Sequence, residues 1–235
     1  MLQRFRLDPR WGLVYLGLGL AGCGGARPAL LPAGLATVEA GQVAGWVSAT
    51  VPTGSARHRF RWLYQDEKSS KGGRGSASLA PPDSLRFDFA GSLGLGKGAA
   101  FVIGDSAQWV VPARSVDELV PSVPLLWALF GIARGPEAGA TLSGLVQEDR
   151  VAWRYAAGPD TVDYLRVTGE VITLHAEMRR GGKVVGRSRM SRKPDGTPLT
   201  AFLSVPSVPA KLEITFYETT PSPGFPPPTW RAPAE

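Results

Sequence analysis

The sequence predicts a mainly β domain whose strands follow one another as an antiparallel meander. The clearest strand is the stretch 58–64, in which inward and outward side chains alternate with a period of two. Later stretches of the same kind are separated by Gly181-Gly182 and Asp195-Gly196, and such dipeptides supply the backbone angles of hairpin turns. One apolar segment in the middle of the chain breaks the alternation and adds a short helical part.

The individual elements are predicted in chain order from the same patterns. Apolar residues at loosely helical spacing favour a short helix over 35–44, and the segment 46–51 then becomes β-branched. A hydrophilic link is predicted over 66–74, and a tight hairpin turn at Gly104-Asp105. Alternation predicts strands over 58–64, 75–79, 85–89, 99–103, 108–111, 141–147, 151–156, 161–167, 171–178, 183–192, 199–205 and 211–218.

The segment 115–135 interrupts the strands. Pro121 and Pro124 divide it into two short helical pieces, and Pro124 suits the first turn of the second piece. This second piece, residues 125–132, is apolar almost all round, which indicates either a buried core helix or a helix that contacts something apolar.

The N-terminus has the layout of a secretory signal peptide. Three arginines precede the apolar run 11–20, which is too short to cross a bilayer, because a spanning helix needs roughly 20 apolar residues. Small residues then lead to Cys23, the only cysteine. Residues 20–23, Leu-Ala-Gly-Cys, resemble the bacterial lipobox, which implies cleavage before Cys23 and acylation of its thiol. The alternative is an ordinary signal peptide with an incidental cysteine.

These observations divide the chain into four parts. Residues 1–22 are a lipoprotein signal peptide, 23–34 an acylated flexible tether, and 35–220 a single domain. Residues 221–235 contain six prolines and are expected to be extended and disordered. An exported chain without a second cysteine has no internal disulfide, so its fold must rest on its core.

The charge distribution argues against nucleic acid as a partner. Removal of residues 1–22 takes away three arginines and one aspartate, so the formal net charge falls from +6 to +4. The surplus is dispersed apart from the stretch 179–193, and basic residues are not interleaved with aromatic ones there. That stretch is either a solvated strand face or a contact with anionic headgroups.

The residues that could carry chemistry do not form a catalytic or metal site. The string Gly-x-Gly-x-x-Gly at 17–22 lies inside the signal peptide, and the phosphate-loop-like stretch 91–98 has Gly98 where a hydroxyl is required. His58 and His175 each belong to a strand pattern without a nearby nucleophile or carboxylate cluster. We therefore expect no enzyme, no metal and no cofactor.

Three stretches resemble a known family: Phe60-Arg-Trp62, the run 83–94, and the run 124–132. Together they resemble the lipoprotein-localisation factors LolA and LolB and related outer-membrane lipoproteins, over roughly residues 35–218. The resemblance implies an incomplete (half) β-barrel with a short helical lid, which holds acyl chains of lipoproteins. Leu93-Gly94 match a loop whose leucine protrudes in the family, although Ser92 replaces the family's proline.

The candidate site residues follow from the aromatic strand faces and the apolar segment, which suit an apolar cavity better than an active site. Plain core packing is the alternative for each of them. Two exposed leucines, Leu93 and Leu95, are expected to contact a membrane. The expected lipid-binding residues are Phe60, Trp62, Phe87, Phe89, Leu125, Leu126, Trp127, Leu129 and Phe130.

The leading hypothesis is a lipoprotein anchored through Cys23 in the bacterial outer membrane and facing the periplasm. It binds acyl chains of lipoproteins or other lipids and takes part in lipoprotein localisation or lipid handling, with a periplasmic carrier protein as a further expected partner. The alternative is a non-enzymatic envelope scaffold or assembly lipoprotein with a packed core and a protein partner. An open or a filled barrel interior distinguishes the two.

Overall fold

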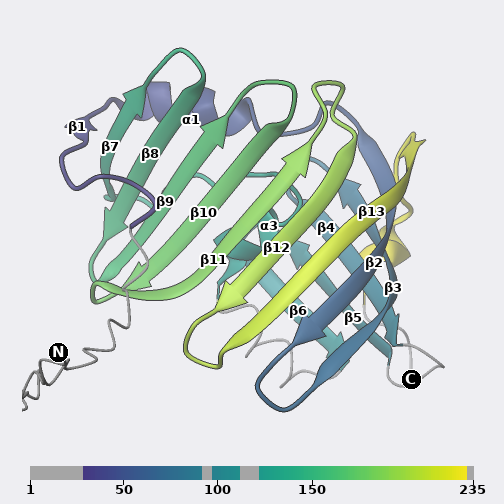
Figure 1. The fold of residues 1–235 in the computed structure, drawn as a ribbon. Coiled ribbons are helices and arrows are strands. Elements are labelled where there is room, and N and C mark those ends of the chain that lie inside the picture. Colours follow the sequence, from purple (N-terminus) through teal and green to yellow (C-terminus); the bar gives the residue numbers. More distant parts are fainter. Residues whose placement is uncertain (1–28, 92–96, 112–121, 232–235) are drawn as a thin grey trace, which may run out of the picture.

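The strands form one curled antiparallel sheet. The structure, a computed structural model, describes residues 29–91, 97–111 and 122–231. Within these ranges thirteen strands are ordered β1-β7-β8-β9-β10-β11-β12-β13-β2-β3-β4-β5-β6 (Figure 1). Strands β1 and β6 are the two edges of this sheet and do not pair with each other. The predicted incomplete β-barrel is therefore confirmed. Cys23, Leu93 and Leu95 lie outside the described residues.

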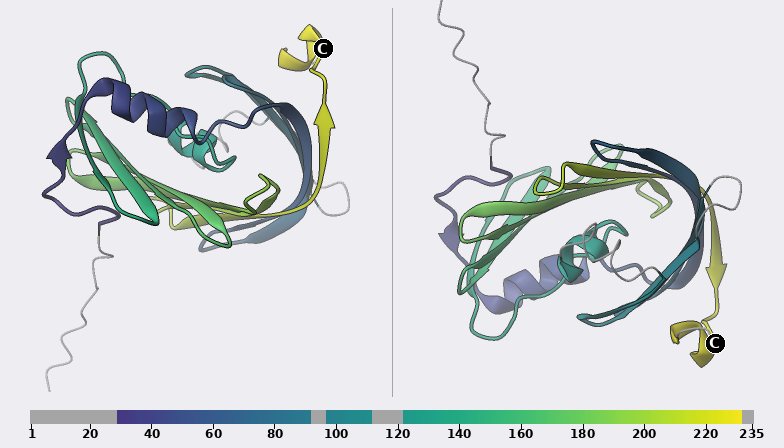
Figure 2. Two further views of the ribbon diagram at one scale, coloured as in Figure 1. Left: turned by 90° about the horizontal axis from the view of Figure 1, so that it is seen from above. Right: turned by 90° about the horizontal axis from the view of Figure 1, so that it is seen from below.

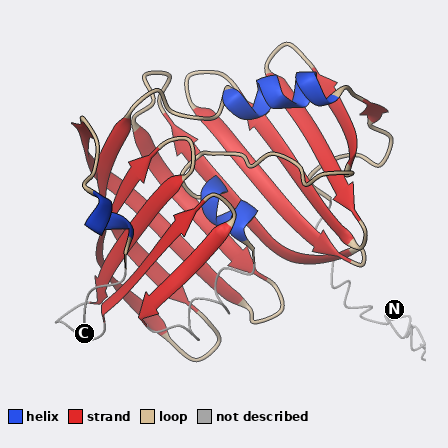
Figure 3. Ribbon diagram, turned by 180° about the vertical axis from the view of Figure 1, so that it is seen from behind, coloured by secondary structure: helices blue, strands red, loops and turns tan. Residues whose placement is uncertain are grey.

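The strands are β1 (Ala36–Thr37), β2 (Ser55–Gln65), β3 (Ser70–Ala80), β4 (Ser84–Gly91), β5 (Lys97–Ile103), β6 (Ser106–Val111), β7 (Thr141–Val146), β8 (Arg150–Ala157), β9 (Asp160–Val167), β10 (Ile172–Arg180), β11 (Lys183–Arg192), β12 (Pro198–Val205) and β13 (Ala210–Ser222). The helices are α1 (Ala40–Ser48), α3 (Val123–Ala128) and the short 3-10 helix η2 (Pro227–Trp230). Both α-helices lie on the concave side of the sheet (Figures 2 and 3). No helix in the described ranges combines the length and the apolar character needed to span a membrane.

Alternating side chains explain why these stretches are strands. Inward residues such as Phe60, Leu174 and Leu203 are buried in the core, whereas their sequence neighbours face outward. Strand β13 joins the two halves of the sheet by pairing with β2, and Phe216 lies opposite Phe60. The predicted hairpin turn at Gly104-Asp105 is present between β5 and β6, where Gly104 has a φ of 59°.

Two predicted boundaries were wrong because tertiary contacts decide them. Strand β3 begins at Ser70, inside the expected link 66–74, because Gly72 and Gly73 continue the ladder opposite Leu63 and Trp62. Helix α1 covers 40–48 rather than 35–44. Trp46, which was assigned to a β-branched stretch, belongs to this helix and packs on Trp153 with ring centroids 6.1 Å apart.

The described parts of the expected tether and tail pack against the outer surface of the sheet. Leu31 is only 3% exposed, and the carbonyl of Pro32 accepts a hydrogen bond from Arg154 Nη1 at 3.5 Å. At the other end, Arg86 Nη1 donates to the carbonyl of Thr229 at 3.1 Å, although disorder was expected from residue 221. The tail contains Phe225 and Trp230, whose edge-to-face contact provides the apolar surface that a proline-rich composition alone does not indicate.

Two fully buried carboxylates lie on the outer face of β9 and β10. Asp163 is 0% exposed and accepts hydrogen bonds from Nε and Nη2 of Arg154, at 2.6 and 2.7 Å. Arg154 stands directly opposite Asp163 on β8. Glu177 is also 0% exposed and is paired with Arg179 and Arg187. Buried charges require such partners, so these ion pairs hold β8 in register with β9, and β10 in register with β11.

We expect Glu177→Gln to lower the free energy of unfolding by about 3 kcal/mol, because it leaves two half-buried guanidinium groups without their negative charge. Denaturant-induced unfolding at pH 7 measures this loss. The matched control is Asp149→Asn, which removes the partner of Arg150 in an exposed pair and should leave the free energy of unfolding nearly unchanged. Equal losses in the two variants would contradict the assigned role of Glu177.

Candidate apolar binding site

The four aromatic residues that were predicted from β2 and β4 share the concave face of the sheet. Phe60 and Trp62 alternate with outward residues on β2, and Phe87 and Phe89 do so on β4. Strand β3 separates the two pairs and contributes small residues there: Gly75 lies opposite both Phe60 and Phe89. The register therefore gathers the four rings on one surface.

Three of these rings remain partly exposed and form what we call the aromatic shelf: Trp62, Phe87 and Phe89. Trp62 meets Phe89 edge to face with centroids 5.7 Å apart, and Phe87 stacks on Phe89 at 6.2 Å. Trp62 Nε1 donates to the carbonyl of Arg74 at 3.2 Å, which holds the indole against β3. Phe60, by contrast, is 3% exposed and belongs to the core.

Glycine residues allow these rings to lie flat on neighbouring strands. A Cβ atom on Gly75 would come within 2.4 Å of the Phe60 ring, and one on Gly98 within 2.0 Å of the Phe89 ring. Any larger residue at either position would push the ring off the sheet. Gly75 on β3 and Gly98 on β5 thus make room for the rings of Phe60 and Phe89 on the concave face.

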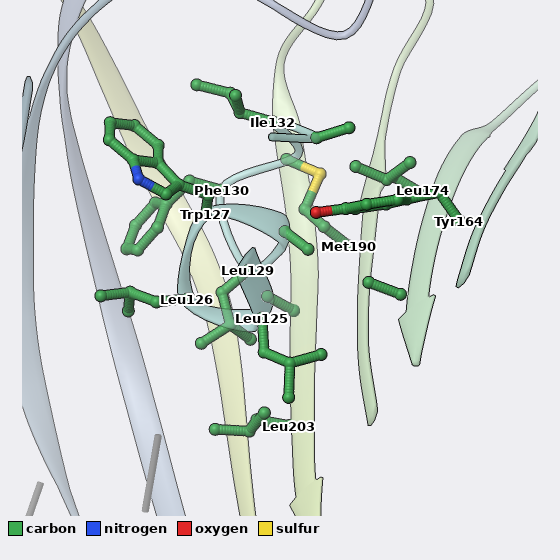
Figure 4. Close-up of a cluster of buried hydrophobic side chains, with 14 of the residues drawn as sticks. Leu125, Leu126, Trp127, Leu129, Phe130, Ile132, Tyr164, Leu174, Met190 and Leu203 are labelled. Carbon is green, nitrogen blue, oxygen red and sulfur yellow. The ribbon is translucent and has the colours of Figure 1, made fainter. Parts of the chain in front are cut away.

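The concave side also contains a segment that we call the interior segment, residues 122–134. Ser122 caps α3 by accepting a hydrogen bond from the Leu125 N–H at 3.4 Å, and Pro124 occupies the first turn, as predicted. All side chains from Leu125 to Leu129 are 0 or 1% exposed. Figure 4 shows Leu126, Trp127 and Phe130 on one side of this segment, with Tyr164 and Leu174 on the other.

Polar contacts hold the interior segment in place at defined points. Trp127 Nε1 donates to the carbonyl of Gly104 at 3.0 Å, and the Ala133 N–H donates to Thr50 Oγ1 at 2.9 Å. The Arg134 N–H donates to the hydroxyl of Tyr164 at 3.2 Å, while the hydroxyl of Tyr155 donates to the Arg134 carbonyl. Burial raises the pKa of Tyr155, and it raises the pKa of Tyr164 to about 12, so both hydroxyls stay protonated at neutral pH.

The predicted lipid-binding residues therefore fall into two groups. The interior segment and Phe60 are packed as core, whereas the aromatic shelf presents partly exposed apolar surface on the concave side. A groove of about 500 Å³ lies elsewhere, on the outer face, and Leu30, His175 and Phe202 are among its lining residues. The described residues contain no group of three His, Cys, Asp or Glu side chains able to hold a metal ion.

Sequence reasoning did not identify Thr50, Tyr155 or Tyr164 as residues that hold the interior segment. Tyr155 and Tyr164 do carry a signal, since each stands at an inward position of a strand, where a buried hydroxyl needs a partner. Thr50 carries none, because its contact with Ala133 joins residues 83 positions apart.

The chain is similar to known proteins in structure but not in sequence. No protein-family model and no curated protein matches the sequence. Among solved structures, the chain is similar to a LolA superfamily protein from Nitrosomonas europaea, at 12% identity and a TM-score of 0.48, over 83% of this chain and 98% of that one. The family name is the one that the sequence resemblance indicated.

Two further solved structures are similar to this chain. A domain described as an outer-membrane lipoprotein-sorting protein from Vibrio parahaemolyticus is 9% identical with a TM-score of 0.44, over 82% of this chain and 97% of that one. A DUF1329 family protein from Desulfovibrio piger is 6% identical with a TM-score of 0.39, over 82% and 95% of the two chains. The fold defines an open antiparallel half-barrel whose concave face is apolar.

The half-buried ring of His58 makes stability depend on pH. Burial lowers the pKa of His58 to about 4, so the unfolded chain binds more protons than the folded one between about pH 6.5 and 4. The neutral ring therefore contributes stability above pH 6.5, and about 2–3 kcal/mol of it should be lost as the pH falls to 4. His58→Phe keeps the edge contact with Phe216 and should reduce this loss. Free energies of unfolding at pH 7 and pH 4.5, measured for wild type and His58→Phe, give the loss in each protein. An equal loss in the two proteins would contradict the prediction.

Proposed function

We propose that this protein is an envelope lipoprotein that holds acyl chains against the concave face of its half-barrel and serves lipoprotein localisation or lipid handling. The observation that supports this most is the aromatic shelf, because Trp62, Phe87 and Phe89 are partly exposed although they face the apolar side of the sheet. Covering such surface with an acyl chain contributes about 0.8 kcal/mol per buried methylene. Binding sites for apolar ligands are lined by side chains of this kind.

The shelf lies on the core rather than apart from it. Phe87 and Trp62 pack against the buried cluster that includes Leu126 and Phe130, and Phe130 meets Phe216 at 6.3 Å on the neighbouring strand β13. A chain lying on the shelf therefore extends an existing apolar surface. It needs no hydrogen-bonding partner along its length, which suits a face made of rings and glycines.

A second function, an envelope scaffold with a protein partner, is favoured by one observation. The side chains from Leu125 to Leu129 fill the interior with at most 1% exposure, as a packed core does. The two functions differ in a measurable way, since only the first requires that the wild-type protein bind a free amphiphile.

We propose further that Cys23 carries the membrane anchor and that the membrane is the bacterial outer membrane. Cys23 precedes the buried residue Leu31 by eight positions, and an extended chain spans at most about 3.5 Å per residue. The anchor then keeps the outer face of β8 within about 28 Å of the acyl chains. Such closeness suits a protein that exchanges lipid with its own membrane.

Trp62→Asp should weaken binding of a fluorescent fatty acid by the full chain at least tenfold, because the charge would have to be buried without a partner beneath the ligand. The control is Leu63→Asp, one position along β2, where the side chain faces outward and is 36% exposed. This variant should bind within about twofold of wild type. If the folded wild-type chain binds no fatty acid at all, the packed scaffold replaces lipid binding as the proposed function.

Cys23→Ser should leave the precursor uncut and without acyl chains, because the lipobox resemblance makes the thiol both the acyl acceptor and the cleavage cue. Mass spectrometry of the N-terminus in wild type and variant measures both changes at once. A wild-type chain that begins unmodified at any other residue would rule out the anchor and leave the fold unaffected.

A further inference from the structure

Two arginines point into the concave side of the sheet at one rim. Arg166 on β9 lies opposite Leu174 on β10, and Leu174 lies opposite Met190 on β11, so all three face the core. Arg192 follows Met190 by two positions and therefore faces the same way. Its Nη1 donates to the carbonyl of Thr50, just beyond α1, at 3.5 Å, which places it on the concave side as well.

This arginine pair lacks the partners that other arginines of the protein have. Arg154, Arg179 and Arg187 each bind a fully buried carboxylate. Arg166 and Arg192 form no salt bridge within the described ranges, and the buried Nε of Arg166 has no hydrogen-bond partner there. Both side chains are only half-buried, but the buried Nε of Arg166 is an exception to the rule that buried polar groups are paired.

The electrostatics agree with the geometry. Burial lowers the pKa of Arg192, and the positive charge of Arg166 lowers that pKa further. Two like charges are thus held near each other in a partly desolvated place, which costs free energy unless an anion lies between them. The planar guanidinium group matches the oxygens of a phosphate or carboxylate, with which it can form paired hydrogen bonds.

A purely structural role explains only one of the two residues. The bond from Arg192 to Thr50 places a cation at the C-terminal end of α1, where it stabilises the helix. Arg166 makes no such bond in the part of the chain that the structure describes. Its stem can cover apolar surface, but a leucine or methionine would do the same without burying an unpaired N–H group.

The surroundings of the pair indicate an amphiphile rather than a polar solute. Arg166 and Arg192 stand at the ends of β9 and β11, and the register puts the ends of the β7–β8 and β9–β10 hairpins at the same rim. Two exposed apolar residues, Val146 at 55% and Val171 at 42%, belong to those hairpins. Cations beside exposed apolar side chains suit a ligand with an anionic head and an apolar chain.

We propose that Arg166 and Arg192 form an oxyanion site that takes the phosphate or carboxylate head of an amphiphile at the rim of the half-barrel. This inference rests on the proposed acyl-chain function for the apolar part of the ligand only. The anion site itself does not depend on that function and can be tested with an anion alone.

The test compares dodecyl phosphate with inorganic phosphate on the full chain kept in dodecyl maltoside, a neutral detergent with the same alkyl chain. Arg166→Met and Arg192→Met should each weaken dodecyl phosphate binding at least tenfold. The matched control is Arg189→Met, an exposed residue of the outer face of β11, and this variant should bind within about twofold of wild type. If inorganic phosphate binds as tightly as dodecyl phosphate, with the same dependence on both arginines, the ligand is a free anion rather than a lipid head.

Melting temperature separates a ligand site from a structural role. Arg166→Met should melt at or above the wild-type temperature, because a half-buried cation with an unpaired Nε is replaced by an apolar side chain of similar length. A clearly lower melting temperature would show that Arg166 stabilises the fold and would overturn the proposal. Equal dodecyl phosphate affinity in wild type and in the Arg166→Met, Arg192→Met double variant would overturn it too.

A fluorescent fatty alcohol, which carries no charge, distinguishes failure of this inference from failure of the proposed function. If the alcohol binds, and dodecyl phosphate binds the arginine variants as tightly as wild type, only the anion site is wrong. If neither amphiphile binds to the folded chain, the acyl-chain function fails as well.

Discussion

The concave face of the open sheet must be covered, and most other features of the structure follow from this constraint. An antiparallel sheet that does not close exposes one whole apolar face unless something packs on it. The interior segment meets this need by burying Leu125 to Leu129 completely, and α1 covers the region of Trp153 through Trp46. The half-barrel and its helices are therefore one core rather than a container with a separate cover.

The polar groups of the protein are arranged around that core. On the inner side, hydroxyls of Thr50, Tyr155 and Tyr164 satisfy backbone groups where the interior segment leaves its helix. On the outer side, Asp163 and Glu177 lie among arginines of adjacent strands. Each of these five residues thus fixes one position of one element, whereas apolar packing alone tolerates many arrangements.

The sequence predicted those parts of the fold that depend on neighbours within one strand or turn. The period of two located the strands from β2 to β13, although it missed the early start of β3 at Ser70, and Pro124 marked the start of α3. Predictions failed where a distant contact decides the structure: Trp46 is helical because it packs over Gly144 and Trp153. The sequence also could not predict which candidate residues are buried and which are partly exposed. Phe60 and Trp62 are both inward aromatic residues of β2, and they differ only in how distant parts of the chain cover them.

The positions of the arginine pair and the aromatic shelf relate the two proposed parts of the ligand site. Strand β11, which carries Arg192, is separated from β2, which carries Trp62, by β12 and β13, or roughly 14 Å at about 4.8 Å per strand. The interior segment lies on the concave face between them and contacts β10 and β11. An acyl chain that follows this diagonal covers apolar side chains that the interior segment covers now. If the acyl-chain function proposed above holds, ligand and segment would compete for one surface, and the hydrogen bonds of Trp127, Ala133 and Arg134 would oppose displacement of the segment.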